Sequence, residues 1–124
     1  MPADYREDLL DWFTNRLMRD PDVQPGRMMG HPGFGCVSNN KLFLMFSGDG
    51  ILLKVPPSRY EEMLARDDVI PFAPMNAHSP MGTWIVWTMI DAEEYEPEWS
   101  IIIEAINHVA AEPPNPKKRR KKKG

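Results

Sequence analysis

The stretch from Arg27 to Pro57 constrains the fold more than any other part of the chain. Short apolar runs alternate there with the turn-forming residues Asn39-Asn40 and Ser47–Gly50. Asn and Gly tolerate the positive φ angles of tight turns, so both segments are expected to reverse the chain. Strands joined by so few residues pair antiparallel, because a parallel crossover needs a dozen or more residues. The stretch therefore predicts a three-stranded antiparallel meander.

The first of these strands is expected to be irregular. It begins at Arg27–Met29, is interrupted or bulged by His31–Gly33, and resumes over Phe34–Ser38. The second and third strands are expected over Lys41–Phe46 and Ile51–Val55.

A helix is expected before the meander. Apolar residues recur there at helical spacing, and Asp4 with Glu7 has the spacing of a capping box. Asp20-Pro21 ends this helix, because the residue before proline avoids the α region, and Asp22–Gly26 follows as a linker. The apolar positions that define the buried face are Tyr5, Leu9, Leu10, Phe13 and Leu17.

The rest of the chain adds two helices and two strands. Ser58 and Glu61 form a second capping-box pattern, which predicts a short helix to about Arg66. Ile70–Phe72 contains a proline and is therefore expected to be an edge strand, and Thr83–Met89 is rich in strand-forming residues. Pro97 opens the last helix. The expected fold is α+β, with two layers, an antiparallel sheet and helices, in the order α-β-β-β-α-β-β-α.

The chain of 124 residues is long enough for one ordinary domain. We expect residues 1–112 to form it and residues 113–124 to be a disordered tail rich in Pro, Lys and Arg. Eight of the fifteen Lys and Arg and all eighteen Asp and Glu lie in residues 1–116, which therefore carry a net charge of −10. The tail carries +7, on Lys117, Lys118, Arg119, Arg120, Lys121, Lys122 and Lys123.

Several short motifs, in order, resemble the N-terminal domain of the TfoX/Sxy proteins. They are Met28-Met29-Gly30, Phe34-Gly35, Lys41-Leu42-Phe43, Gly50–Pro56, Pro71-Phe72, Pro80-Met81-Gly82 with Trp84, and the closing Glu112–Lys118. The resemblance covers roughly residues 5–120. It implies an α+β fold and, in the longer members, a role in regulating competence for DNA uptake. Those members carry a second domain that has no counterpart here, and the resemblance supplies no catalytic residues.

The residues that could carry chemistry do not form a recognisable set. His31, Cys36, His78 and His108 lack the paired spacing of a zinc site. The glycines near residues 30–35 and 48–50 do not match a phosphate-binding loop. The acidic run from Asp91 to Glu98 suits the solvated approach to a helix. We therefore expect no catalytic residues, no cofactor and no metal, and a protein that is not an enzyme.

The strands contain a sharper clue, because two of them are apolar on both faces. Successive side chains of a strand point to opposite faces of the sheet. In Lys41–Phe46 and Thr83–Met89, both of the resulting sets contain large apolar residues, so both faces of the sheet are apolar. We expect a second protomer or an apolar ligand in a groove to cover the second face, or, equally, the loop Pro74–Gly82. The residues assigned to this second face are Phe43, Met45, Ile85, Trp87 and Met89.

The tail is the candidate contact for nucleic acid. Seven phosphate contacts on duplex DNA would give a slope of about −6 in log affinity against log salt. No recognition element accompanies the tail, so such binding would be sequence-independent. The alternatives are that the tail folds back on the acidic body or only solubilises the chain.

Taken together, these patterns predict a small, non-enzymatic regulatory or interaction domain of the TfoX N-terminal type. The alternative is a small-molecule-binding module that uses the apolar second face of the sheet. A homodimer, an unidentified protein partner and nucleic acid are the expected partners, with no membrane. A single cysteine, Cys36, suits a reducing cytoplasm.

Overall fold

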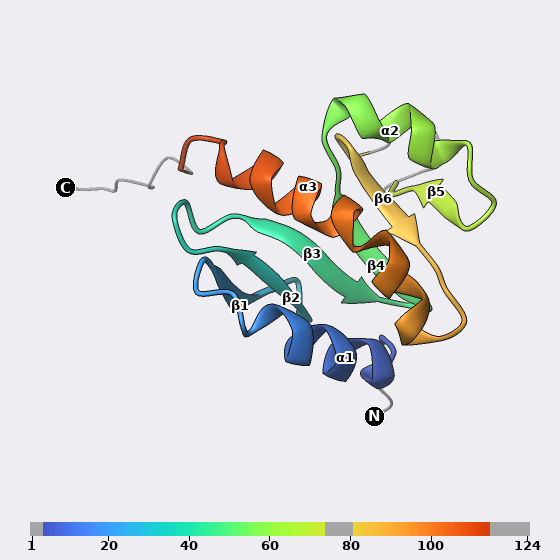
Figure 1. Ribbon diagram of the computed structural model, residues 1–124, viewed down its shortest axis with the longest axis horizontal. Coiled ribbons are helices and arrows are strands. Elements are labelled where there is room, and N and C mark those ends of the chain that lie inside the picture. Colours follow the sequence, from blue (N-terminus) through green and yellow to red (C-terminus); the bar gives the residue numbers. More distant parts are fainter. Residues whose placement is uncertain (1–3, 74–80, 115–124) are drawn as a thin grey trace.

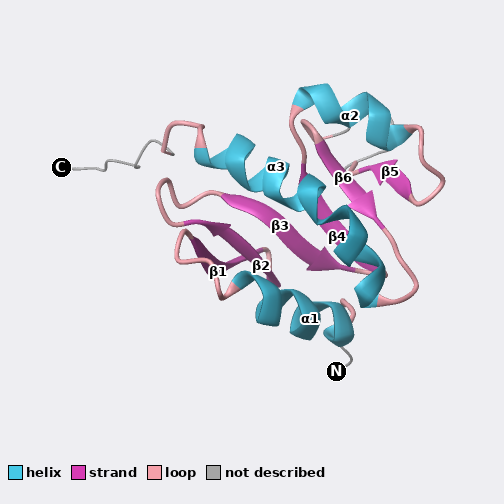
Figure 2. Ribbon diagram, viewed as in Figure 1, coloured by secondary structure: helices cyan, strands magenta, loops and turns pink. Residues whose placement is uncertain are grey.

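The computed structural model describes residues 4–73 and 81–114, which form an antiparallel sheet and its helices (Figure 1). The predicted α+β fold, an antiparallel sheet with helices, is confirmed. The sheet has six strands in the order β1-β2-β3-β4-β6-β5, and every neighbouring pair is antiparallel. Figure 2 shows the same elements by type. Their bounds are α1 Glu7–Leu17, β1 Val23–Met28, β2 His31–Cys36, β3 Leu42–Ser47, β4 Gly50–Lys54, α2 Pro57–Leu64, β5 Val69–Pro71, β6 Trp84–Trp87, the 3₁₀ helix η1 Ala92–Glu98 and α3 Trp99–Ala110.

The predicted order of elements holds, except that the structure has one more strand, β1, at the start of the predicted meander. Residues expected to form a linker, Asp22–Gly26, largely belong to β1, which pairs with β2 from Val23 to Met28. Met29 and Gly30 make the connecting turn with φ angles of 52° and 83°. This turn was missed because positive φ is uncommon for a residue such as Met. The predicted interruption at His31–Gly33 is therefore the first half of β2.

The two predicted capping boxes are wrong. The N-cap of α1 is Arg6 and that of α2 is Pro56, and neither helix has a side-chain cap hydrogen bond. Asp4 lies before the helix instead, where its carbonyl oxygen accepts a 2.6 Å hydrogen bond from the Gly48 amide. Pro57 takes an early position in α2, where a missing N–H costs nothing. Tertiary contacts and proline thus set both helix starts.

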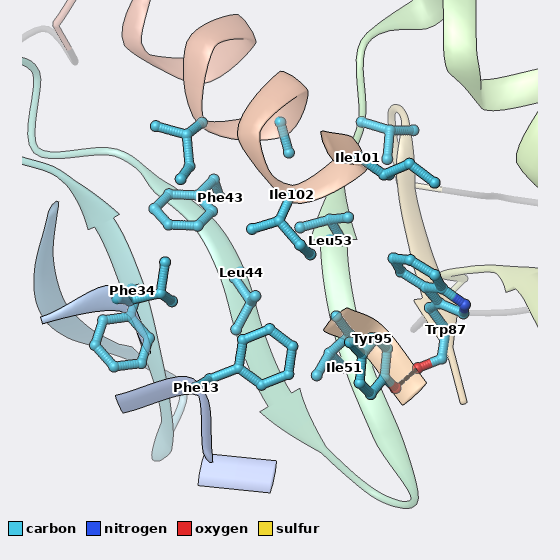
Figure 3. Close-up of a cluster of buried hydrophobic side chains, with 14 of the residues drawn as sticks. Phe13, Phe34, Phe43, Leu44, Ile51, Leu53, Trp87, Tyr95, Ile101 and Ile102 are labelled. Carbon is cyan, nitrogen blue, oxygen red and sulfur yellow. Dashed lines mark hydrogen bonds between the residues drawn. The ribbon is translucent and has the colours of Figure 1, made fainter. Parts of the chain in front are cut away.

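The main core lies between the sheet and the helices. All three α-helices and η1 place their buried side chains in it, and α3 packs along β2, β3 and β4. Figure 3 shows aromatic rings in this core, among them Phe13 and Tyr95, which meet edge to face. Phe13 also contacts Phe46 edge to face. Large aromatic rings bury much apolar surface, so their burial contributes strongly to hydrophobic stabilisation.

A β-bulge in β3 decides which residues face this core. Phe34 pairs with Leu44 and Gly35 pairs with Leu42, so Phe43 is the extra residue. The bulge breaks the period-two alternation, and both Phe43 and Leu44 lie in the main core.

The predicted assignment of residues to the second face is wrong for four of its five members. Ile85 and Trp87 are fully buried in the main core together with Phe43, and Met89 packs against that core. Only Met45 lies on the opposite face. The error arose because alternation cannot tell which of two apolar sets faces the helices when both are apolar.

Candidate functional site

One face of the sheet carries a second apolar cluster that no described helix covers. Met45, Leu52 and Trp84 are buried in it, and partly buried residues surround them. The buried side chains of every described helix belong to the main core instead. We call this surface the helix-free face. Its partly buried members are Met28, Leu42, Phe72 and Val86.

An apolar cleft lies beside the β5 edge of this face. Its volume is about 480 Å³. Ile70 is 60% exposed there, and it pairs with Val86 on the neighbouring strand. The lining residues are Ile70, Pro71, Phe72, Ala73 and Val86.

A second cleft lies where β3 begins and β4 ends, and its lining combines cations with apolar residues. We call it the basic cleft. Its volume is about 340 Å³, and Arg27, Lys41 and Lys54 line it together with Asn40 and Glu112. Met28, Leu42 and Trp84 of the helix-free face form its apolar part.

Antiparallel pairing brings the two lysines together. Lys41 directly precedes β3 and Lys54 ends β4, so both lie at the same end of the β3–β4 pair. Lys54 also pairs across the sheet with Trp84 of β6. Arg27 comes from β1, whose hairpin with β2 packs next to β3. Its guanidinium donates a 2.9 Å hydrogen bond to the Gly30 carbonyl oxygen.

The carboxylate of Glu112 lies between the two lysines. Its Oε1 lies 3.2 Å from Lys41 Nζ and its Oε2 lies 2.8 Å from Lys54 Nζ. Burial by itself would raise the pKa of Glu112, but the hydrogen bonds from Lys54 and Lys41 outweigh it and lower the pKa. The carboxylate is therefore charged at neutral pH. His108 Nε2 lies 3.7 Å from the same group.

Asn39 fixes the end of α3 beside this cleft. Its side chain is 6% exposed, and its Nδ2 donates to the carbonyl oxygens of Val109 at 2.7 Å and Glu112 at 3.0 Å. Its Oδ1 accepts from the Lys41 amide at 3.2 Å. In Figure 1 the C-terminal end of α3 accordingly lies next to the β2–β3 turn. The position of Glu112 follows from this anchor.

The other cations of the body mostly meet carboxylates of their own. Arg59 makes two hydrogen bonds to Glu104, and Arg66 makes two to Asp68 and two to Glu98. In the basic cleft, by contrast, Lys41 and Lys54 share one carboxylate, Glu112, and a third cation, Arg27, lines the same cleft. Among ion pairs of the described residues, none includes Arg27.

The histidines and the cysteine considered from sequence lie apart. His31 begins β2, and His108 lies on α3. Cys36 is buried, its Sγ donates weakly to the Ile106 carbonyl oxygen at 3.7 Å, and burial raises the pKa of the thiol. His78 falls outside the described residues, as do the tail residues 117–123. Within residues 4–73 and 81–114, no three His, Cys, Asp or Glu side chains come together as a metal site.

The predicted acidic approach to the last helix forms η1. Glu96 pairs with Arg16 at 2.6 Å, and Glu98 pairs with Arg66 at 2.7 Å. These carboxylates therefore help to join η1 to α1 and to the segment after α2.

Sequence reasoning missed the basic cleft. The signal that could have found it is the predicted meander itself, since residues that begin one strand and end the next lie side by side. Arg27 and Glu112 carry no such signal, because each reaches the cleft through a tertiary contact.

No protein-family model, curated protein or solved structure matches this chain significantly. Among the described residues, no helix combines the length and apolar character needed to cross a bilayer.

Proposed function

We propose that this chain is a small, non-enzymatic interaction domain of the cytoplasm that contacts nucleic acid without sequence preference through Lys117–Lys123. The observation that carries the proposal is where α3 ends. Asn39 and the two lysines hold Glu112 at the basic cleft, and the seven tail cations begin five residues later in the sequence. The tail cations thus follow closely in sequence on the segment that reaches the basic cleft.

This distribution of charge suits a polyanion. Residues 1–116 carry −10 overall, yet Arg27, Lys41 and Lys54 gather at a single cleft. A local cluster of one sign attracts an opposite charge even when the net charge opposes it. Lysine and arginine contacts to phosphates supply affinity without reading bases.

A binding titration on a labelled duplex of random sequence tests the proposal. We expect the full chain to bind at low salt with a slope of about −6 in log affinity against log salt. Replacing all seven tail cations by serine should abolish binding to the duplex. A variant with Arg16→Gln and Arg59→Gln removes two body cations that lie outside both the tail and the basic cleft, and it is the control. Equal binding by the tail variant and the wild type would refute the proposal.

The resemblance to the TfoX/Sxy N-terminal domain supports a regulatory setting for this contact. Its fold expectation, α+β, agrees with the observed fold, and its Met28–Gly30 motif forms the β1–β2 turn. We therefore include in the proposal a protein partner of regulatory type. Pull-down with the full chain and the serine-tail variant, each with and without nuclease, separates that partner from nucleic acid.

A second candidate function is binding of a small apolar molecule, or of a second copy of the chain, on the helix-free face. It is favoured by the apolar cleft at Ile70 and Val86. We expect the uncharged dye Nile red to bind there and Val86→Glu to abolish binding. Ile90→Glu, at a position 82% exposed and outside the cleft, is the control. Light scattering that shows a strict monomer would exclude the second copy.

A further inference from the structure

We infer that the basic cleft is a binding site for one nucleotide, whose phosphate takes the place of the Glu112 carboxylate between Lys41 and Lys54. The inference deepens the proposed function and rests on it, because it assigns a body site to the same class of ligand. The residues of the basic cleft are described by the structure, whereas the tail residues of the proposed function lie outside the described residues.

The two lysines already converge on one anionic group. Their Nζ atoms lie 3.2 and 2.8 Å from the two oxygens of a single carboxylate. The Lys54 distance is that of a short, charge-assisted hydrogen bond, and the Lys41 distance is that of a longer one. A phosphate offers the same acceptor chemistry with one more oxygen. The observed pairing therefore marks the place where an anion fits.

The charge of the cleft leaves room for such an anion. Arg27, Lys41 and Lys54 contribute three positive charges, and Glu112 offsets one of them. A terminal phosphate carries about −1.5 to −2 at pH 7, so it neutralises the three cations better than a carboxylate does. The Arg27 guanidinium supplies the fork geometry that suits phosphate oxygens.

The displaced carboxylate would turn toward His108. His108 lies one helical turn before Glu112, with its Nε2 at 3.7 Å. The Glu112 backbone stays in place, because Asn39 holds its carbonyl oxygen at 3.0 Å. Exchange of anions at the lysines would therefore involve rotation of the Glu112 side chain rather than movement of its backbone.

The floor of the cleft suits the base of a nucleotide. Met28 and Leu42 are partly buried apolar residues beside the cations, and Trp84, which pairs across the sheet with Lys54, completes the apolar lining. An aromatic ring buries its apolar faces against such residues. The cleft volume of about 340 Å³ lies in the range of small-ligand sites.

Titration of the full chain with adenosine monophosphate, followed by NMR, tests the inference. We expect saturable shifts of the Met28 methyl group and the Lys41 amide, with assignment confirmed by Met28→Leu. The double variant Lys41→Gln, Lys54→Gln should bind about tenfold or more weakly, since it loses both charged donors. Arg59→Gln, which removes a cation of α2 outside the cleft, should bind as the wild type does.

A variant with the opposite effect guards against loss of fold. Glu112→Gln removes the competing charge, so we expect about three- to tenfold tighter binding of adenosine monophosphate. Misfolding could not produce this gain. Unchanged or weaker binding by Glu112→Gln would refute the competition. Equal affinity for inorganic phosphate and adenosine monophosphate would refute the nucleotide assignment.

The serine-tail variant separates this inference from the proposed function. It should keep the nucleotide shifts while losing duplex binding. Duplex binding by the wild type without any nucleotide shift would overturn the cleft assignment and leave the tail contact standing. Nucleotide shifts without tail-dependent duplex binding would overturn the tail contact and support the cleft.

Discussion

The Tyr95 hydroxyl donates a 2.6 Å hydrogen bond to the backbone carbonyl oxygen of Trp87 inside the main core (Figure 3). Both side chains are fully buried, and their rings meet edge to face at 5.0 Å. Burial raises the pKa of Tyr95, so the hydroxyl remains a donor throughout the neutral range. The bond joins η1 to β6.

Removal of this hydroxyl should destabilise the fold. We expect Tyr95→Phe to lower the free energy of unfolding by about 1–2 kcal/mol, because a buried hydrogen bond is lost without a large change of shape. Urea denaturation measures the effect. Tyr60→Phe, at a partly buried position of α2, is the control and should change stability much less. Equal losses of stability in Tyr95→Phe and Tyr60→Phe would contradict a specific contribution from the Tyr95 hydrogen bond.

The Arg66 ion pairs should make stability depend on acid pH. Hydrogen bonds from Arg66 lower the pKa of Asp68 and of Glu98 from ordinary values of 3.8 and 4.5. Because the folded-state pKa values lie below the unfolded ones, the contribution is complete above about pH 4.5 and is lost as the pH falls through the lowered values.

We therefore expect Arg66→Gln to be less stable than the wild type at pH 7 and to lose less stability on acidification to pH 3. The difference should be about 1 kcal/mol, since these side chains are about 30% exposed and solvent weakens the pairs. Urea midpoints measured from pH 7 to pH 3 test this. Arg16→Gln, which breaks a more exposed pair with Glu96, is the control. Parallel pH profiles for Arg66→Gln and the wild type would contradict the prediction.

Asn39 should control the order of the end of α3. We expect Asn39→Ala to cost about 2–3 kcal/mol, because two carbonyl oxygens lose a buried donor. Amide hydrogen exchange at Ala111 and Glu112 should accelerate more than in the rest of α3. Asn107→Ala, at an exposed position of the same helix, should leave both quantities nearly unchanged. Protection that is preserved in Asn39→Ala would show that other contacts hold this end.

Gly50 should be intolerant of a side chain. A Cβ atom there would lie 2.5 Å from the Trp87 carbonyl oxygen, which belongs to the paired backbone of β6. We expect Gly50→Ala to destabilise by about 2–3 kcal/mol through overpacking. A Cβ atom at Gly48 would have no atom within 4 Å. Gly48→Ala should therefore lower the free energy of unfolding only through the positive φ of +63°, by about 1–2 kcal/mol. A larger loss at Gly48 in thermal unfolding would contradict this order.

Much of the secondary structure could be predicted because it depends on local patterns. Helical spacing from Leu9 to Leu17 and the short turns of the meander require only neighbouring residues, and the proline of β5 correctly placed that strand at an edge. The β1–β2 hairpin escaped prediction because Met29 adopts an uncommon positive φ.

The candidate site depended on contacts that the sequence does not encode locally. The sequence alone determined that the sheet is antiparallel, that its central strands are apolar on both faces and that the charge divides between body and tail. Only the tertiary structure decided which face the helices cover, since both faces are apolar, and a one-residue bulge at Phe43 interrupts the alternation of β3. It also brought Arg27, Lys41, Lys54 and Glu112 together, because strand pairing and the Asn39 anchor join segments that are far apart along the chain.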